Sequence, residues 1–151
     1  MLKLRKNKKG FTLVELIVVI AIMAVLAGVV AGVTVSQLNK QTNKTGSAQA
    51  KTIADFISTV ALTGENEDGE TKLLKDDGTF DSDALDTLIS AQYKAASITV
   101  TYSATKPTSF DTGKIAVFLD GGVVHVKYTK KGNTGEEAEY TVATTGVVSK
   151  V

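Results

Sequence analysis

The sequence contains no cysteine, one histidine and one proline. Without cysteine the chain has neither a disulfide nor a thiolate for a metal site or a thiol dyad. His125, the single histidine, falls on the more polar face of a predicted strand, where we expect a structural role rather than catalysis. No glycine-rich phosphate loop and no nucleophile elbow is present. We therefore expect no catalytic residue, no metal and no cofactor, and a protein that is not an enzyme.

Charge is nearly absent from one long stretch. Between Phe11 and Val35 the only ionisable side chain is Glu15. As a helix these residues extend about 37 Å, enough to cross a hydrocarbon core of about 30 Å. The preceding residues 1–10 have no acid and carry five basic side chains: Lys3, Arg5, Lys6, Lys8 and Lys9. Such a basic block stays on the cytoplasmic side, which predicts that the chain beyond Val35 is exported.

An ordinary cleaved secretory signal is one alternative for this N-terminus. Val25-Leu26-Ala27 offers the small residues of such a cleavage site. Two features oppose it, because the apolar run is longer than the roughly 7–15 residues of a cleaved signal and because Glu15 lies within the run. The sequence therefore favours an apolar segment that stays in the mature protein.

The run Lys9-Gly10-Phe11-Thr12-Leu13-Val14-Glu15 resembles the class III signal of type IV pilins and pseudopilins. The resemblance covers about Lys8 to Val35. It implies that a prepilin peptidase removes the leader 1–10 by cutting between Gly10 and Phe11 and that the new amino terminus of Phe11 is methylated. It also implies that residues 11–35 remain as the transmembrane and assembly half of a long helix.

Glu15 needs a reason to remain in an apolar helix. A carboxylate at mid-bilayer costs about 2.5–3.5 kcal/mol and is normally retained for a partner. In a filament of staggered helices, Glu15 of one subunit meets the cationic Phe11 amine of its neighbour in a weakly screened apolar core, which sets subunit register. The alternative is a carboxylate that snorkels to the interface or is protonated.

The charge balance changes when the leader is removed. Losing five of the 17 basic side chains leaves 12 against 16 acids, so the mature side chains sum to −4. This argues against general nucleic-acid binding but leaves a local basic patch open. Many Gram-negative relatives close their C-terminal region with a disulfide, so the absence of cysteine resembles the pilins of Gram-positive bacteria.

The long helix is expected to continue beyond the apolar segment as an amphipathic half over residues 36–62. A buried stripe recurs there with helical spacing, formed by Ile53, Phe56, Ile57, Val60 and Ala61. Within the membrane half, Gly28 and Gly32 form a small-xxx-small pair that favours close helix packing. Type IV pilins commonly have proline where this chain has Gly32, in a region that can unwind on assembly. Glycine weakens a helix less than proline but more than other residues, so we expect a smaller degree of local flexibility here.

Residues 63–151 are expected to form a globular head. The acidic stretch from Gly64 to Glu70 ends the long helix, and a second helix is capped by Asp81 or Ser82, with Leu85, Leu88 and Ile89 buried. A calcium loop is one interpretation of the acids Asp76, Asp77, Asp81 and Asp83. Their spacing does not match an EF-hand, and helix capping together with solvated loop charge explains them better.

The last third predicts an antiparallel sheet. Alternation begins at Ile98, the segment from Ile115 to Leu119 is apolar on both faces, and Asp120-Gly121-Gly122 predicts a tight hairpin. A looser turn at residues 132–135 and an edge strand within residues 147–151 complete it. Because the apolar face of the sheet needs the stripe of the long helix as a cover, we predict an α+β fold.

The resemblance predicts a structural subunit of an extracellular type IV pilus. Its expected partners are the prepilin peptidase, the platform protein and assembly ATPase of the pilus machinery, and other copies of the chain. Its expected locations are the cytoplasmic membrane, as a single-pass protein, and then the cell surface. Two alternatives share the evidence: a pseudopilin of a secretion or competence machine, and a membrane-anchored adhesin that does not polymerise.

Overall fold

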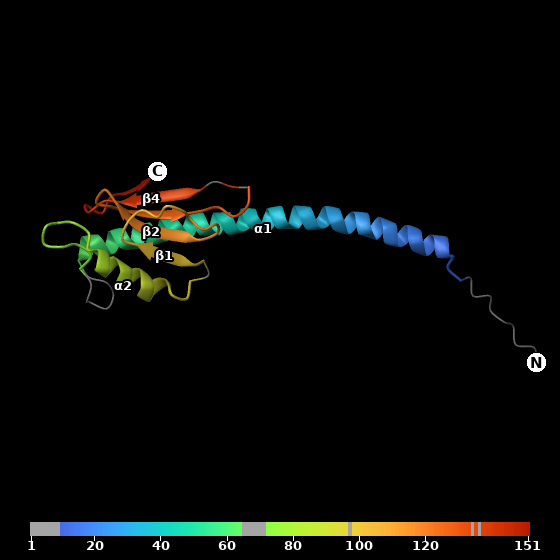
Figure 1. Cartoon of the computed structure of the whole chain (residues 1–151), viewed down its shortest axis with the longest axis horizontal. Coiled ribbons are helices and arrows are strands. Elements are labelled where there is room, and N and C mark those ends of the chain that lie inside the picture. Colours follow the sequence, from blue (N-terminus) through green and yellow to red (C-terminus); the bar gives the residue numbers. More distant parts are fainter. Residues whose placement is uncertain (1–9, 65–71, 97, 134, 136) are drawn as a thin grey trace, which may run out of the picture. The chain divides into compact units, whose positions relative to one another are not determined.

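The computed structural model describes residues 10–64, 72–96, 98–133, 135 and 137–151. The chain divides into two compact units, one up to Gln37 and one from Leu38 to Val151. Its elements, labelled in Figure 1 where space allows, are α1 (Leu13–Thr63), α2 (Ser82–Tyr93), β1 (Val100–Ser103), β2 (Ile115–Asp120), β3 (Val123–Tyr128), β4 (Ala138–Val142) and β5 (Val148–Lys150).

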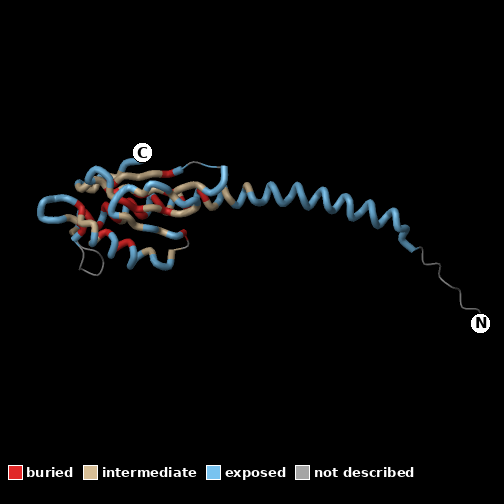
Figure 2. Tube along the Cα trace, viewed as in Figure 1, coloured by how far each residue is buried: buried red, intermediate tan, exposed pale blue. Residues whose placement is uncertain are grey.

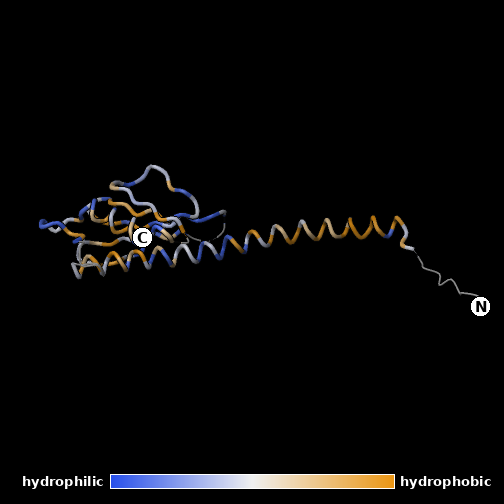
Figure 3. Tube along the Cα trace, turned by 90° about the horizontal axis from the view of Figure 1, so that it is seen from below, coloured by the Kyte–Doolittle hydropathy of each residue, from blue (hydrophilic) through white to orange (hydrophobic). Residues whose placement is uncertain are grey.

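The first unit consists of the N-terminal part of α1. Its apolar residues are exposed along the whole length of this part of the helix, including Leu13, Ile20 and Val33, and Figure 2 shows it coloured as exposed. Figure 3 shows the same part of α1 coloured as hydrophobic. It is long and apolar enough to cross a membrane. A helix that is apolar all round and has no protein cover is a membrane span or a surface for other helices.

The second unit has its core between α1, α2 and one face of the sheet. The predicted stripe of α1 is confirmed, with Ile53, Ile57, Val60 and Ala61 buried and Phe56 half-buried against the cluster. α2 adds its own buried face, and the sheet adds alternate side chains of its strands. Burying an apolar side chain of this size contributes about 1.5–3 kcal/mol, so this stripe is a main source of the stability of the unit.

The five strands are ordered β1-β2-β3-β4-β5. Val117 pairs with Val126, which in turn pairs with Tyr140, so alternate side chains of β2, β3 and β4 share the face under α1. The predicted hairpin between β2 and β3 is confirmed. Gly121 and Gly122 at its turn have φ of 59° and 79°, backbone angles that residues with a Cβ rarely adopt. The predicted edge strand is β5.

One expectation for the sheet is wrong. β1 runs parallel to β2, with Val100 opposite Ile115, so the sheet is mostly rather than wholly antiparallel. Residues 104–114 form a connection that returns the chain to the starting end of β1, whereas a tight hairpin would force an antiparallel pair. The strand also begins at Val100, not Ile98. The fold class is nevertheless the predicted α+β.

The ends of the helices largely follow their predicted signals. α1 ends at Thr63, where Gly64 has φ of 73° and donates its N–H to the Val60 carbonyl at 3.0 Å. The rest of the acidic stretch, residues 65–70, lies outside the described residues, as does Thr134 of the looser turn. Asp81 is the N-cap of α2, because its carboxylate accepts hydrogen bonds from the backbone of Asp83 and Ala84.

Candidate processing and assembly site

The start of α1 is fixed by two side chains. Thr12 donates its backbone N–H and its hydroxyl to Glu15 Oε2, each at 2.8 Å, and the Glu15 N–H donates to Thr12 Oγ1 at 3.2 Å. This reciprocal pattern is a capping box, which satisfies backbone donors that the first turn of a helix leaves unpaired. The helix consequently begins at Leu13, two residues later than expected from the sequence.

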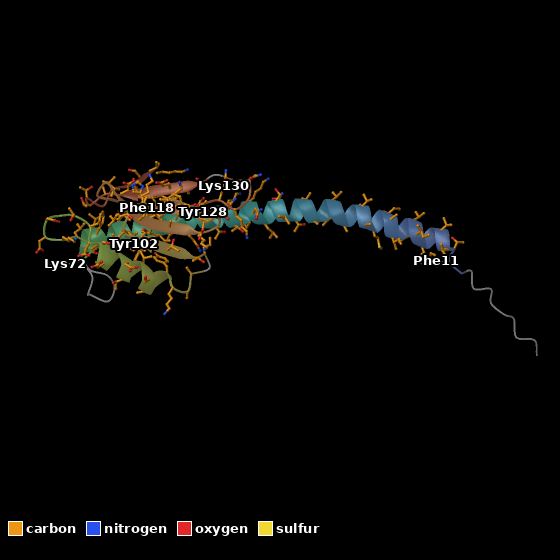
Figure 4. The ribbon with its side chains drawn as sticks, viewed as in Figure 1. Phe11, Lys72, Tyr102, Phe118, Tyr128 and Lys130 are labelled. Carbon is orange, nitrogen blue, oxygen red and sulfur yellow. The ribbon has the colours of Figure 1, made fainter. Side chains whose placement is uncertain are left out.

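The Gly10-Phe11 junction lies just outside this cap. Both residues precede the helix and are exposed, and Phe11 is 89% exposed (Figure 4). A Cβ added to Gly10 would meet nothing within 4 Å. The fold of the chain itself therefore does not require glycine at position 10. If glycine is needed there, the need comes from an enzyme that binds the junction.

Thr12 is a residue of the candidate site that was not expected from the sequence. Its signal was present, since Thr-x-x-Glu before an apolar run is the sequence pattern of a capping box. The geometry also gives Glu15 a partner within its own chain, in addition to the expected partner in a neighbouring subunit. A filament contact with a Phe11 amine therefore has to share or replace the bonds that Glu15 makes with Thr12.

Gly28 and Gly32 lie in unbroken helix. A Cβ at either position would have no neighbour within 4 Å in this single chain. Between them, the Val30 carbonyl accepts the hydroxyl of Thr34 at 2.8 Å, so that hydroxyl is satisfied without water. The glycines therefore leave open space on the surface of α1, and their proposed role in close packing and flexibility remains a prediction.

The head-side part of α1 is fastened to the sheet by a buried amide. Asn43 is 3% exposed, and its Oδ1 accepts the Tyr128 hydroxyl at 2.9 Å and the Lys131 N–H at 2.8 Å, while its Nδ2 donates to the Lys131 carbonyl at 3.1 Å. Burial raises the pKa of Tyr128, which keeps this hydroxyl protonated as a donor. One turn along α1, a Cβ at Gly46 would overlap the Tyr128 ring. This contact fixes both the rotation and the height of α1 on the sheet.

His125 lies on the other face of the sheet. Its ring stacks on Phe118 with a centroid distance of 5.0 Å, and its Nδ1 is 2.9 Å from Glu139 Oε1. Partial burial raises the pKa of Glu139, but the hydrogen bond from His125 and the charge of Lys127 outweigh it, so this pKa is lowered. The ionised carboxylate only accepts, so His125 Nδ1 is the donor. The geometry is that of a structural hydrogen bond between strands.

Two of the acids that a calcium loop would use, Asp77 and Asp81, make local hydrogen bonds instead. Asp77 accepts the hydroxyl and the N–H of Thr79 at 2.6 and 2.9 Å, which lowers its pKa, and Asp81 caps α2. Among the described residues, no three carboxylates or histidines lie together as a metal site. Capping and turn formation therefore account for both of these side chains.

Comparison with known proteins finds one match. Residues 5–31 match the family model described as the prokaryotic N-terminal methylation motif. No curated protein and no solved structure matches the chain. The matched region contains the junction, the capping box and the first 19 residues of α1 (residues 13–31), with Gly28 inside it and Gly32 just beyond it. The motif implies processing by a prepilin peptidase, and it indicates that this chain is a type IV pilin-like or pseudopilin protein.

Proposed function

We propose that this protein is the structural subunit of an extracellular type IV pilus. A prepilin peptidase cuts between Gly10 and Phe11 and the Phe11 amine is methylated. The cytoplasmic membrane holds the mature chain until a platform protein and an assembly ATPase add it to a homopolymer. The absence of cysteine supports the Gram-positive type.

The observation that carries this proposal is the surface of the first unit. Its apolar side chains are exposed all round, and its one carboxylate, Glu15, is held at the first turn beside the junction. An anchor alone gains nothing from that carboxylate, because its transfer into a bilayer costs free energy. In a filament the same surface is buried by neighbouring copies, and Glu15 lies at the depth of a neighbour's amino terminus. A polymerising helix therefore explains both features.

Intact mass and N-terminal sequencing of protein taken from cells test the processing step. We expect a chain that starts at Phe11 and carries one additional methyl group. A chain that starts at Gly28 would show an ordinary signal peptide and would overturn the proposal. Gly10→Val should leave uncut precursor in the membrane at near-normal amount, since the fold places nothing against position 10.

Sheared surface fibres distinguish the remaining functions. A pilus subunit should be the main protein of long fibres seen by immunogold labelling. A pseudopilin of a secretion or competence machine should give short filaments within the envelope, and a membrane-anchored adhesin should stay in the membrane fraction without polymer. Either of these two results would replace the pilus assignment while retaining the cleavage at Gly10.

A further inference from the structure

One end of the second unit gathers lysines from three separate segments. Lys40 and Lys44 lie one turn apart on α1, Lys114 precedes β2, and Lys130 and Lys131 follow β3. Backbone bonds hold these segments together: Gly113 donates to the Thr129 carbonyl at 2.7 Å and Thr129 donates to the Lys114 carbonyl at 3.1 Å. Asn43 completes the connection by bonding both backbone groups of Lys131. We call these five lysines the basic end.

Most of this charge is uncompensated within the part of the chain that the structure describes. Lys114 pairs with Asp111 at 2.8 Å, whereas the other four lysines form no ion pair with a described carboxylate. Lys40 and Lys44 are additionally a like-charged pair at i and i+4, which is slightly unfavourable in a helix. A bound anion would relieve both costs.

The acids of the unit are concentrated elsewhere. Five lie between Asp76 and Asp86, in the loop and helix that follow Lys72. Figure 4 shows Lys72 and Lys130 at opposite ends of this unit. The overall negative charge of the mature chain therefore does not describe its basic end, where Asp111 pairs with Lys114 and Glu137 lies 3.9 Å from Lys127 rather than from a lysine of the basic end.

Chain connectivity brings the basic end close to lipid. Lys40 follows Val35 by five residues and Lys44 follows it by nine, so the chain cannot separate these lysines from the apolar segment by more than about 18 and 32 Å. Attraction to a charged surface extends over a Debye length of about 8 Å at physiological salt, and this short tether keeps both lysines near a membrane that holds the apolar segment. Lysine on the exported flank also opposes the usual distribution of charge around a membrane helix, so its presence calls for a specific partner.

We propose that the basic end binds the phosphate headgroups of anionic lipids on the exported face of the membrane and so docks the head before assembly. The lysines supply mobile ammonium groups, which suit phosphodiesters presented on a flat surface. This inference rests on the membrane-held stage of the proposed function. Assembly into a fibre must then break the contact between the basic end and the lipid headgroups. The docked head is the form in which the subunit waits in the membrane before assembly.

The test uses the full mature chain in vesicles, and the lack of native cysteine allows labelling at one site. Thr112→Cys places a fluorophore beside the basic end, and Asp76→Cys places it in the acidic loop. All vesicles contain a little phosphatidylcholine with a nitroxide on its headgroup, which quenches a fluorophore that touches the surface. One set is otherwise phosphatidylcholine, and the other contains about 30% phosphatidylglycerol, a content that gives a strongly negative surface.

We expect quenching at position 112 to increase at least about twofold with phosphatidylglycerol and to fall back at about 0.5 M NaCl, with little change at position 76. Replacing Lys40, Lys44, Lys130 and Lys131 with glutamine should abolish the increase. The matched control, glutamine at Lys72, Lys75, Lys94 and Lys150, removes the same charge elsewhere and should retain it.

The proposal would be overturned if quenching at position 112 were equal in both lipids. It would also be overturned if the control variant lost the phosphatidylglycerol-dependent increase to the same extent as the variant of the basic end. Competition by a short DNA duplex at equal phosphate concentration, stronger than that of soluble phosphatidylglycerol headgroup, would assign the basic end to nucleic acid and also overturn it.

Resistance of the inserted chain to carbonate extraction is measured first. Failure to insert refutes the membrane stage of the proposed function, whereas insertion without quenching refutes only the docking.

Discussion

The Tyr128 hydroxyl at the end of β3 donates to Asn43 Oδ1 on α1 at 2.9 Å, across 85 residues of sequence. Both groups are buried, so removing either one leaves the other without a hydrogen-bond partner, and water cannot reach it as a replacement. Asn43→Ala should lower the free energy of unfolding of the head by about 2–4 kcal/mol, because it also orphans the Lys131 N–H. Tyr128→Phe should cost less. Urea unfolding of both single variants and the double variant should show a coupling above about 0.5 kcal/mol, and strict additivity would contradict the contact.

Gly46 should not tolerate a methyl group. A Cβ there overlaps the buried Tyr128 ring, so Gly46→Ala forces the ring or the helix to move, at a cost of about 1–3 kcal/mol that exceeds the roughly 1 kcal/mol gained from helix propensity. Gly28→Ala is the matched control because its Cβ meets nothing. Thermal unfolding should show a lower midpoint for Gly46→Ala and an equal or higher one for Gly28→Ala. A stabilised Gly46→Ala head would refute the packing.

Two substitutions at Glu15 separate its cap from its charge. Glutamine at this position of a capping box still accepts from Thr12, whereas valine does not. If assembly needs the carboxylate as a partner for a neighbour's Phe11 amine, both Glu15→Gln and Glu15→Val should give abundant processed monomer in the membrane and few fibres. If only the cap matters, Glu15→Gln should assemble normally. Quantifying membrane and sheared fractions decides between them, and wild-type fibre levels in Glu15→Val would exclude both roles.

The lowered pKa of Glu139 predicts an acid-side loss of stability. Because the folded-state pKa is below the ordinary value of 4.5, the ionised carboxylate favours folding. This contribution is complete above about pH 4.5 and disappears as pH falls through the folded-state pKa. Glu139→Gln should therefore flatten the decline of unfolding free energy between about pH 5 and 3. Glu137→Gln, which removes a more exposed carboxylate 3.9 Å from Lys127, is the control for the loss of one acidic charge.

The α+β class, the buried stripe of α1 and the tight hairpin were predictable because each depends on local periodicity or on a short turn. The parallel pairing of β1 was not, since residues 104–114 do not specify in which direction the chain returns. At the candidate site, the sequence indicated Gly10, Phe11 and Glu15 through the leader and the lone acid. The role of Thr12 as the N-cap is contained in the local pattern Thr-x-x-Glu, but that pattern does not by itself distinguish a cap on Glu15 from a partner in another subunit.

The hydrogen bonds of Asn43 to the sheet could not be predicted, because no local sequence pattern specifies them. Asparagine within a helix predicts a solvated side chain, yet Asn43 is buried because Tyr128 and Lys131 supply its partners from 85 and 88 residues away. The requirement for Gly46 has the same origin, since only the Tyr128 ring excludes a side chain there. Such positions follow from tertiary contacts and become visible only when the strands are placed.

The C-terminal turn also contacts α1, because Ser58 donates its hydroxyl to the Gly146 carbonyl, 88 residues later. The stripe on α1 is covered by strands that are synthesised last, and β5 closes the sheet edge only when Val151 donates to Glu139. The apolar segment precedes all of these strands in the chain. In a protein exported as proposed, the head therefore completes its sheet only after β5 has crossed the membrane, and residues 38–63 stay without their cover until then.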